Sequence, residues 1–356
     1  MAENVTYLIG AGASAGKREK TEDGKVRIME GLPCVAEIPA RLEELAKYFE
    51  NIKIPAQSIL LFGFFLNLKE LEDTRVELVR DLRELQKQSA NHATIDTYAR
   101  KLLLTGQREE FKRLEKLLSF YFIIEQVILP PDSRYDTFFA NILKDNCEIP
   151  DQINVISWNY DSQFEIAYKL YNDNALLTSD KQSENFTKIA KIIKINGSAT
   201  FQNMPSDMPT DLPTFRQDLF SKLENIVDEE KDYYMMERLL ELYSKTVGSN
   251  GDLNETFLSF AFDRRIFPTK EIFERVNAIM EETKALVIIG YTFPFFNREI
   301  DRKILQAMKP DTNIYIQDLA PEKIKQNLQS VLTSSQRSCP IIPLKYTDQF
   351  ALPPEL

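Results

Sequence analysis

The stretch NVTYLIGAGASAG, residues 4–16, combines a short β-branched and aromatic run with a Gly/Ala/Ser loop. This order predicts a strand that leads into a tight turn and then a helix. Glycine lets a backbone approach a pyrophosphate closely, and a helix N-terminus presents oriented N–H groups to it. The loop is therefore a candidate phosphate-binding turn, and a strand–helix turn without a ligand is the alternative. It departs from the dehydrogenase fingerprint, because the third glycine is displaced to Gly16 and no acidic residue ends a strand about 20 residues later.

Strand signals return at later points of the chain and alternate with helical periodicity. Apolar, β-branched runs cover residues 153–161, 191–197, 285–291 and 313–319, and CPIIPLKY at 339–346 is a candidate for one more strand. Strands separated by helices in this way predict an α/β fold. We expect a Rossmann-like parallel sheet that is covered on both faces and carries large helical insertions.

The helical stretches indicate the domain organisation. Apolar residues recur at three- and four-residue steps from about residue 33 to 146 and again from 215 to 282. We expect a Rossmann-like domain formed by residues 1–34 and 150–356, with a helical insertion at about 215–282. Residues 35–149 are expected to form a separate helical module.

The composition limits the classes of function. Of the 356 residues, 43% are hydrophobic and 28% charged, which is typical of a globular protein, and the formal net charge is −10. That charge argues against direct nucleic-acid or anionic-membrane binding, although a local basic patch stays open. No apolar run approaches the ~20 residues of a membrane span, and the N-terminus lacks the features of a signal peptide. We therefore expect a cytoplasmic protein.

Cysteine and histidine are too few for common metal centres. Cys34, Cys147 and Cys339 are widely scattered, so neither a disulfide framework nor a four-cysteine zinc site is expected. His92 is the single histidine, which excludes a multi-histidine centre. We predict no metal site. A carboxylate magnesium site stays open as an alternative, although no clustered Asp/Glu motif suggests one.

Polar residues follow the two strands at 153–161 and 191–197. The first ends in SWNYD, where Asn159 and Asp161 are two apart and can point to the same side. A simple Asn/Asp turn with a helix N-cap is the alternative. The second strand ends in Asn196-Gly197, a strong turn signal that also brings a polar side chain to the end of a strand.

The stretch IIGYTFPFFNREID, residues 288–301, follows the same design. Gly290 permits close approach of a ligand, Thr292 can contact phosphate or ribose, and Asp318 ends the next strand, where a carboxylate can accept hydrogen bonds from ribose hydroxyls. A turn acid is the alternative for Asp318. The three phenylalanines of this stretch are expected in the core rather than in a cofactor site: Phe293, Phe295 and Phe296.

Each motif lies at the carboxyl end of a predicted strand, where ligands bind in open α/β sheets. In this order, GAGAS, GLP, SWNYD, KINGS and IGYTF resemble the SIR2-like family. More specifically, they resemble bacterial SIR2-domain proteins that consume NAD+ in antiphage defence. The resemblance covers roughly residues 1–34 and 150–320, and NHATIDTYARKL at 91–102 also resembles a helical segment of some bacterial members.

The resemblance implies an NAD+ site at this edge of the sheet. Asn159 is implied at the nicotinamide ribose and Asp161 on the nicotinamide side. The pyrophosphate would be cradled by Gly10, Ala11, Gly12 and Ser14. The adenosine half would be held by Gly290, Thr292 and Asp318, and Gly197 also belongs to the implied NAD+-binding set.

Two departures from the family pattern bear on the chemistry. Protein-deacetylating sirtuins carry a zinc module with paired cysteines, which this chain cannot build, so neither deacetylation nor zinc binding is expected. The family's histidine, in an HG dipeptide, aligns with Asn196-Gly197. General-base catalysis contributes about 10²–10⁴-fold, so its loss slows the reaction without necessarily abolishing it.

Two side chains are candidates to replace the missing base. His92 is of the side-chain type that titrates near neutral pH, and a long insertion can bring it to the sheet. A solvated surface histidine is the alternative for this residue. The carboxylate of Asp161 is the other candidate. Asn196 can hold a ribose hydroxyl or a water, but an amide cannot take up a proton near neutral pH.

The activity that the resemblance implies is hydrolysis of NAD+ to nicotinamide and ADP-ribose, by an effector that depletes NAD+ in antiphage defence. A catalytically weak or inactive SIR2-like protein that binds NAD or ADP-ribose as an assembly or sensor subunit is the alternative. A different nucleotide enzyme on the same sheet is a third. The long helical insertions further suggest a homo-oligomer, or docking to a companion ATPase (HerA-like) or another recognition subunit.

Overall fold

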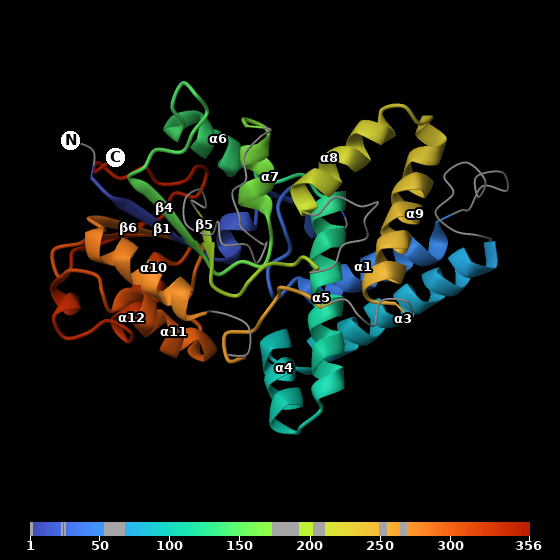
Figure 1. The fold of residues 1–356 in the computed structure, drawn as a ribbon, viewed down its shortest axis with the longest axis horizontal. Helices are drawn as coiled ribbons and strands as arrows, with labels where there is room; N and C mark the ends of the chain where they lie inside the picture. The colour runs from blue at the N-terminus through green and yellow to red at the C-terminus, as the bar shows by residue number, and fades with distance from the viewer. Residues whose placement is uncertain are drawn as a thin grey trace. The chain divides into compact units, whose positions relative to one another are not determined.

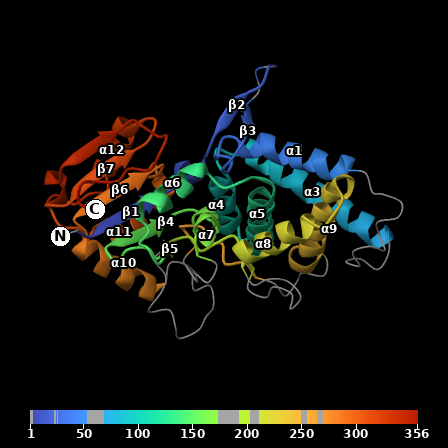
Figure 2. The same cartoon turned by 90° about the horizontal axis from the view of Figure 1, so that it is seen from above.

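The computed structural model describes residues 3–22, 24, 26–52, 68–172, 192–201, 211–248, 255–263 and 269–356 (Figures 1 and 2). The chain forms two compact units. The sheet unit comprises Met1–Leu32, Leu129–Ser198 and Ser259–Leu356. The helical unit comprises Pro33–Ile128 and Ala199–Leu258.

The sheet unit contains one parallel sheet. Its strands are β1 (Val5–Ile9), β4 (Ile153–Ser157), β5 (Ile192–Lys194), β6 (Ala285–Ile289), β7 (Asn313–Gln317) and β8 (Ile341–Leu344). Among the described residues these six strands lie in the order β5-β4-β1-β6-β7-β8, and every neighbouring pair is parallel. Numbered along the chain this is the 3-2-1-4-5-6 order of a doubly wound Rossmann sheet. The predicted fold class is confirmed, including the late strand.

Helices cover both faces of the sheet (Figure 1). One face carries α6 (Ser133–Ile142) and α7 (Gln163–Lys169), and the other carries α10 (Lys270–Glu282), α11 (Arg298–Leu305) and α12 (Pro321–Gln329). Side chains of β6 alternate between the two cores: Val287 packs with α6 and α7, whereas Ile288 packs with α10 to α12. A strand buried on both faces needs apolar residues throughout, which explains the unbroken β-branched runs of the sequence.

The helical unit contains the long amphipathic helices that the periodicity predicts. They are α1 (Ile38–Asn51), α3 (Leu68–Asn91), α4 (Ile95–Leu104), α5 (Arg108–Ile128), α8 (Leu212–Leu223) and α9 (Asp228–Thr246). Helix α3 packs against α1, α4, α5 and α9. Polar caps start two of these helices, because Thr94 and Asp211 accept hydrogen bonds from the backbone N–H groups of Thr97 and Thr214.

The unit boundaries differ from the predicted domains. Residues 129–149 belong to the sheet unit, because Tyr135 and Phe139 on α6 pack in the core against β1 and β4. Helix α10, predicted within the insertion at 215–282, covers the sheet as well. Residues 199–258 belong instead to the helical unit. Periodicity identifies a helix but not the core on which its apolar face packs.

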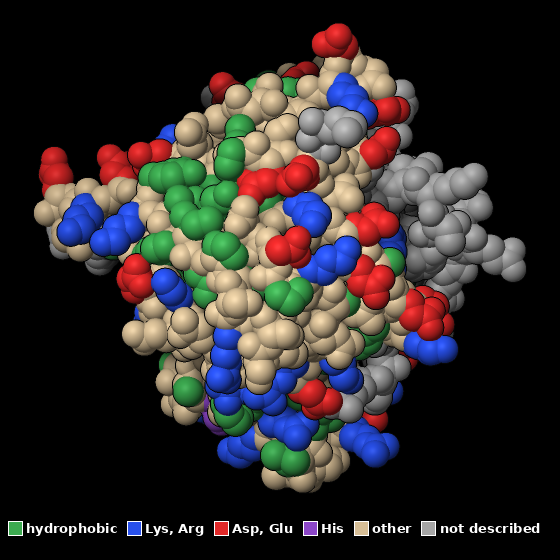
Figure 3. All heavy atoms as spheres, turned by 90° about the vertical axis from the view of Figure 1, so that its left-hand side faces the viewer, with side chains coloured by type: hydrophobic (Ala, Val, Ile, Leu, Met, Phe, Trp, Pro, Cys, Tyr) green, Lys and Arg blue, Asp and Glu red, His purple; other side chains and the backbone are tan. Residues whose placement is uncertain are grey.

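Charges of both signs share the surface. On the face drawn in Figure 3, Lys and Arg side chains are interspersed with Asp and Glu, and a group of hydrophobic side chains lies among them. In the helical unit, Lys222 lies 2.9 Å from Asp218, one helical turn away. Exposed pairs of this kind contribute little to stability.

None of the described helices is long and apolar enough to cross a membrane.

Candidate functional site

The loops that follow β1 and β6 cross where the strand order reverses, at the centre of the sheet. The backbone N–H of Gly12 donates to the carbonyl of Gly290 over 3.0 Å, and that of Gly10 donates to Ile289 over 3.0 Å. A Cβ on Gly12 would lie 2.6 Å from the Cα of Gly290. The crossing therefore needs glycine at both positions, whether or not a ligand binds.

The turn after β1 contains less helix than the sequence predicts. Ala11–Ser14 form a single 3-10 turn of four residues, η1. The chain then enters a small antiparallel hairpin, β2 (Arg18–Lys20) and β3 (Val26–Ile28), which projects from the sheet (Figure 2). The expected α-helix, with its aligned peptide dipoles, is not formed directly after this loop.

Protein groups occupy several N–H groups of this turn. The N–H of Ala13 donates to the carbonyl of Gly10 over 2.9 Å. The N–H of Gly16 donates to the carboxylate of Asp132 over 2.7 Å. Arg134 braces both sides, because its guanidinium donates to Asp132 over 3.0 Å and to the carbonyl of Gly12 over 2.8 Å. Of the four residues predicted to cradle a pyrophosphate, Ala11 is the exposed one. Pyrophosphate binding by these residues stays a prediction.

Ser14 joins the first loop to the SWNYD motif. Its Oγ accepts a hydrogen bond from Asn159 Nδ2 over 3.2 Å and donates to Asp161 Oδ1 over 3.1 Å. The hydroxyl of Tyr135 lies 3.1 Å from the same oxygen. Asn159 Nδ2 also donates to the carbonyl of Gly10 over 3.0 Å. The structure thus brings together Gly10, Ser14, Asn159 and Asp161, all of them buried.

The carboxylate of Asp161 accepts a hydrogen bond that supports the local turn, and its burial changes its pKa. Its Oδ1 also accepts the backbone N–H of Gln163 over 3.0 Å, as in the turn that the sequence left open as an alternative. Burial raises the pKa of the Asp161 carboxyl above its ordinary value, and the charge of Lys194 acts in the opposite direction. A buried carboxyl with a raised pKa can exchange a proton closer to neutral pH than an exposed one.

Lys194 and Glu165 form an ion pair that sequence reasoning missed. Lys194, on β5, places its Nζ 3.0 Å from Glu165 Oε1 on α7, and the same ammonium donates to the backbone carbonyl of Asp161. Burial raises the pKa of Glu165, while Lys194 lowers it. A lysine inside the buried run KIIKING is the signal that could have indicated this pair, because charges are rarely fully buried unless paired.

Asn196 lies two residues beyond Lys194, in the turn that follows β5. It is 7% exposed, and its Oδ1 is buried without a hydrogen-bond donor among the described residues. Its backbone carbonyl accepts from Ser259 N–H over 2.9 Å. Gly197 has a φ of 67°, as a turn of this kind requires. A buried acceptor without a donor fits a site that a ligand hydroxyl or a water completes.

The residues after β6 and β7 are less clearly arranged for a ligand. Thr292 is exposed, and its carbonyl accepts from Asn327 Nδ2 over 2.9 Å. Asp318 Oδ1 accepts the backbone N–H of Ala320 over 2.9 Å and thereby supports the turn before α12. This contact matches the alternative for Asp318, a turn acid, while its role at a ribose stays a prediction.

The expectation of three core phenylalanines is wrong for two of them. Phe293 is buried, but Phe295 is 77% exposed and Phe296 is 41% exposed. The physical reason is the 3-10 turn η2 (Phe295–Asn297), which has no buried residue. The Arg298 guanidinium carbon lies 5.5 Å from the centroid of the Phe295 ring, within the range of a cation–π contact.

His92 lies in the helical unit. Its Nδ1 is 2.9 Å from the carbonyl of Gln88, and its ring centroid is 4.9 Å from that of Tyr98. These contacts join the imidazole to the end of α3 and to α4. Its proposed role as a replacement base stays a prediction.

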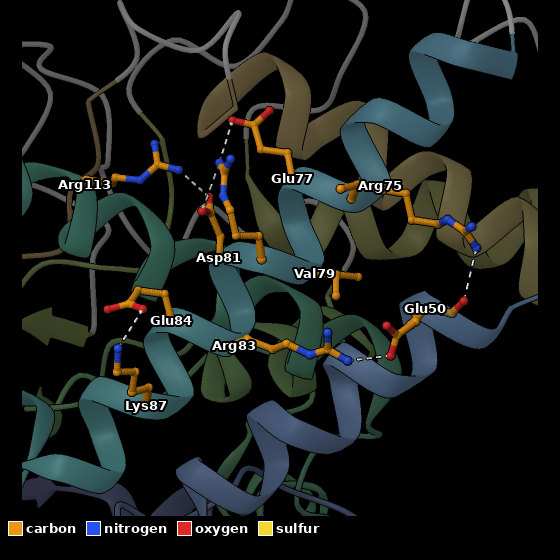
Figure 4. Close-up of a pocket in the computed structure, with 11 residues that line it drawn as sticks. Glu50, Arg75, Glu77, Val79, Asp81, Arg83, Glu84, Lys87 and Arg113 are labelled. Carbon is orange, nitrogen blue, oxygen red and sulfur yellow. Dashed lines mark hydrogen bonds and ion pairs between the residues drawn. The ribbon is translucent and has the colours of Figure 1, made fainter.

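A pocket of about 850 Å³ lies along α3 in the helical unit, with further walls from α1 and α5. Figure 4 shows its basic side chains turned toward acidic ones. Arg83 is 2.6 Å from Glu50, and Arg113 is 2.6 Å from Asp81. Because basic and acidic groups neutralise one another, the pocket does not present charge of one sign to a ligand.

No family model matches the chain, and no curated protein matches it. The fold and the contacts around Ser14 are therefore the physical basis for a functional proposal.

Proposed function

We propose that the protein is an NAD+ glycohydrolase, which cleaves NAD+ to nicotinamide and ADP-ribose. The observation that carries the proposal is the hydrogen-bonded group of Ser14, Asn159 and Asp161. It joins the loop after β1 to the end of β4, at the carboxyl edge where Rossmann sheets bind nucleotides. The resemblance of these segments to SIR2-like proteins supports the same function.

The residues suit a reaction with a cationic transition state. Hydrolysis breaks the bond between ribose C1′ and the nicotinamide nitrogen, which keeps the electron pair, and water then adds to C1′ and releases a proton. Charge develops on the ribose much as it does in glycoside cleavage. Both donor contacts of Asn159 Nδ2 are made to protein oxygens, so its Oδ1 is the atom that accepts a ribose hydroxyl. The Asp161 carboxylate stabilises the positive charge.

Asn196 binds and orients in this proposal. Its buried Oδ1 accepts a hydrogen bond from a ribose hydroxyl or from the attacking water, but the amide cannot remove a proton. We therefore expect turnover below that of an enzyme with histidine at this position, by about 10²–10⁴-fold.

Cleavage of a fluorescent NAD+ analogue, together with chromatographic detection of nicotinamide, tests the proposal. The wild-type protein is expected to release nicotinamide, and Asn159→Ala is expected to reduce the rate by about 10²-fold or more. Lys222→Ala, a surface change in the helical unit, serves as the control and should leave the rate unchanged. Absence of nicotinamide release by the wild-type protein, both alone at every protein concentration and together with any activating partner, would contradict the proposal.

A binding module without turnover is the second candidate, favoured by Asn196 in the position of the family histidine. In this role the protein binds NAD or ADP-ribose as an assembly or sensor subunit. Calorimetry that shows NAD+ binding, together with no nicotinamide release, would support it. A gain of cleavage in Asn196→His would show that the rest of the site is competent.

The biological role follows from the resemblance alone. We propose an effector that depletes NAD+ during phage infection and whose activity is controlled by assembly, either into a homo-oligomer or with a companion ATPase. Measurement of cellular NAD+ after infection, in cells with the wild-type protein or Asn159→Ala, tests the role. Native mass spectrometry of the purified protein tests the assembly.

A further inference from the structure

Three buried charged groups lie together at the end of the SWNYD motif. Asp161 is 6% exposed, Glu165 is 5% exposed and Lys194 is 8% exposed. The ammonium of Lys194 contacts Glu165 Oε1 at 3.0 Å and donates to the backbone carbonyl of Asp161. The charge of Lys194 thus acts on the two buried carboxyl groups of Asp161 and Glu165. When both carboxyls are ionised, the three residues together carry one excess negative charge.

Neighbouring elements do not offset this excess among the described residues. The charges that act on Glu165 are those of Lys194 and Asp161. Tyr135 on α6 faces Asp161, and the charges of Asp132 and Arg134 also act on this tyrosine. Asp132 and Arg134 neutralise each other, because the Arg134 Nε is 3.0 Å from each carboxylate oxygen.

Two buried acceptors of this region have no donor among the described residues. They are Glu165 Oε2 and Asn196 Oδ1. The first is on the residue paired with Lys194, and the second follows Lys194 by two positions. A buried carboxylate oxygen without a donor is costly unless a proton or a positive charge compensates it.

We propose that Glu165 and Lys194 are specificity and positioning residues of the NAD+ site. Lys194 holds the backbone at Asp161, and Glu165 supplies the excess negative charge that selects the cationic nicotinamide ring of NAD+ over the uncharged ring of NADH. The two nucleotides share their riboses and phosphates, so this ring charge is what distinguishes them electrostatically. The inference rests on the proposed function.

Proton linkage follows from the burial of these groups. Burial raises the pKa of both Asp161 and Glu165. Below that raised pKa a proton cancels the excess charge, and binding of the cationic ring expels the proton. The Kd for NAD+ therefore falls as pH rises, by up to about tenfold per pH unit below the pKa. The Kd for NADH is not expected to depend on the protonation of Asp161 and Glu165.

Titration calorimetry of the full chain with NAD+ and with NADH tests the inference. The measurements run from about pH 4.5, the ordinary pKa of a glutamate, up to pH 8, in buffers of different ionisation enthalpy. The wild-type protein is expected to prefer NAD+ by about tenfold at pH 8 and to release a proton on binding it at low pH. Glu165→Gln keeps the size of the side chain and should lose both the preference and the proton release, with the Kd for NADH unchanged. Glu237→Gln, at a buried carboxyl of the helical unit, is the matched control and should keep the wild-type preference for NAD+ and the wild-type proton release.

The outcomes separate this inference from the proposed function. Retention of the NAD+ preference and of proton release in Glu165→Gln would overturn the inference alone. Equal wild-type affinity for the two nucleotides would do the same. If Glu165→Gln does not fold, the wild type decides, because a Kd for NAD+ that is constant from about pH 4.5, the ordinary pKa of a glutamate, up to pH 8 overturns the inference. A wild-type protein that binds neither nucleotide would overturn both proposals.

Discussion

Gly12 and Gly290 meet backbone to backbone at the centre of the sheet. A Cβ on Gly290 would lie 2.3 Å from the Cα of Gly12, and Gly290 has a φ of 59°. The same contact is closed by the hydrogen bond from Gly12 N–H to the Gly290 carbonyl. Because β1 and β6 are neighbours at the point where the strand order reverses, this crossing sets the shape of the edge where we place the nucleotide.

Replacing Gly290 by alanine should therefore destabilise the sheet unit strongly. The left-handed backbone and the clash with Gly12 together cost about 2–5 kcal/mol. Trp158, the single tryptophan, is buried in this unit, so urea unfolding followed by its fluorescence measures the loss. Gly106→Ala is the control, because Gly106 has a φ of 74° but no atom within 4 Å of an added Cβ. Equal stability of Gly290→Ala and wild type would show that the contact with Gly12 does not require glycine at position 290.

Ser14→Ala should destabilise the same unit without a change of shape. The substitution removes the oxygen that pairs with Asn159, Asp161 and Tyr135, and it leaves buried polar atoms unsatisfied. We expect a loss of about 1–3 kcal/mol in the free energy of unfolding. Ser338→Ala, at an exposed serine, should change it by less than about 0.5 kcal/mol. Trp158 fluorescence in urea measures both, and a similar small effect at Ser14 would argue against a shared hydrogen-bonded group.

Lys194→Met should destabilise the protein in a pH-dependent manner. It removes the cation that serves Glu165 and Asp161, and breaking a buried pair costs about 3–5 kcal/mol. Without Lys194 the folded-state pKa of these carboxyls rises further above the unfolded value, so the cost is small near pH 4 and grows as pH rises toward 8. Thermal unfolding at a series of pH values measures it. Glu165→Leu in the Lys194→Met background should restore much of the stability, and failure of that rescue would show that the two residues act independently.

The sequence predicts the sheet well because its signal is local. Buried strands such as β1 and β6 need apolar residues on both faces, and each break in such a run marks a strand end. Convergence of Ser14 with Asn159 depends on the pairing of β1 with β4, which adjacent carboxyl ends in a parallel sheet make natural. The motifs at these strand ends could therefore be identified before the structure was known.

Long-range packing sets the features that the sequence did not reveal. The role of Gly12 depends on β6 lying beside β1, and neither stretch contains that information by itself. Glu165 lies in a helix whose described residues are nearly all buried, so its carboxylate looks like an ordinary helical charge until Lys194 is placed beside it. Phe295 and Phe296 were misplaced because hydrophobicity does not show that η2 turns outward.

Glu237, on α9, should make the helical unit less stable as pH rises. Its side chain is fully buried, and burial, followed by the charge of Glu241, raises its pKa from 4.5 to about 7. Between these two values the folded protein binds more protons than the unfolded chain, so the free energy of unfolding falls as pH increases. We expect a loss of about 1–3 kcal/mol between pH 5 and pH 8 from this group.

Glu237→Gln tests the prediction, because the amide keeps the shape and cannot ionise. The variant should match the wild type near pH 5 and exceed it by about 1–3 kcal/mol at pH 8. Far-UV circular dichroism in urea measures the transition, since the helical unit contains no tryptophan. Glu274→Gln, at an exposed side chain of α10, should leave the pH profile unchanged. Other buried carboxyls such as Glu125, whose pKa is also raised to about 7, contribute equally to both proteins. Parallel pH profiles of Glu237→Gln and wild type would therefore show that Glu237 is ionised at no cost in the folded state.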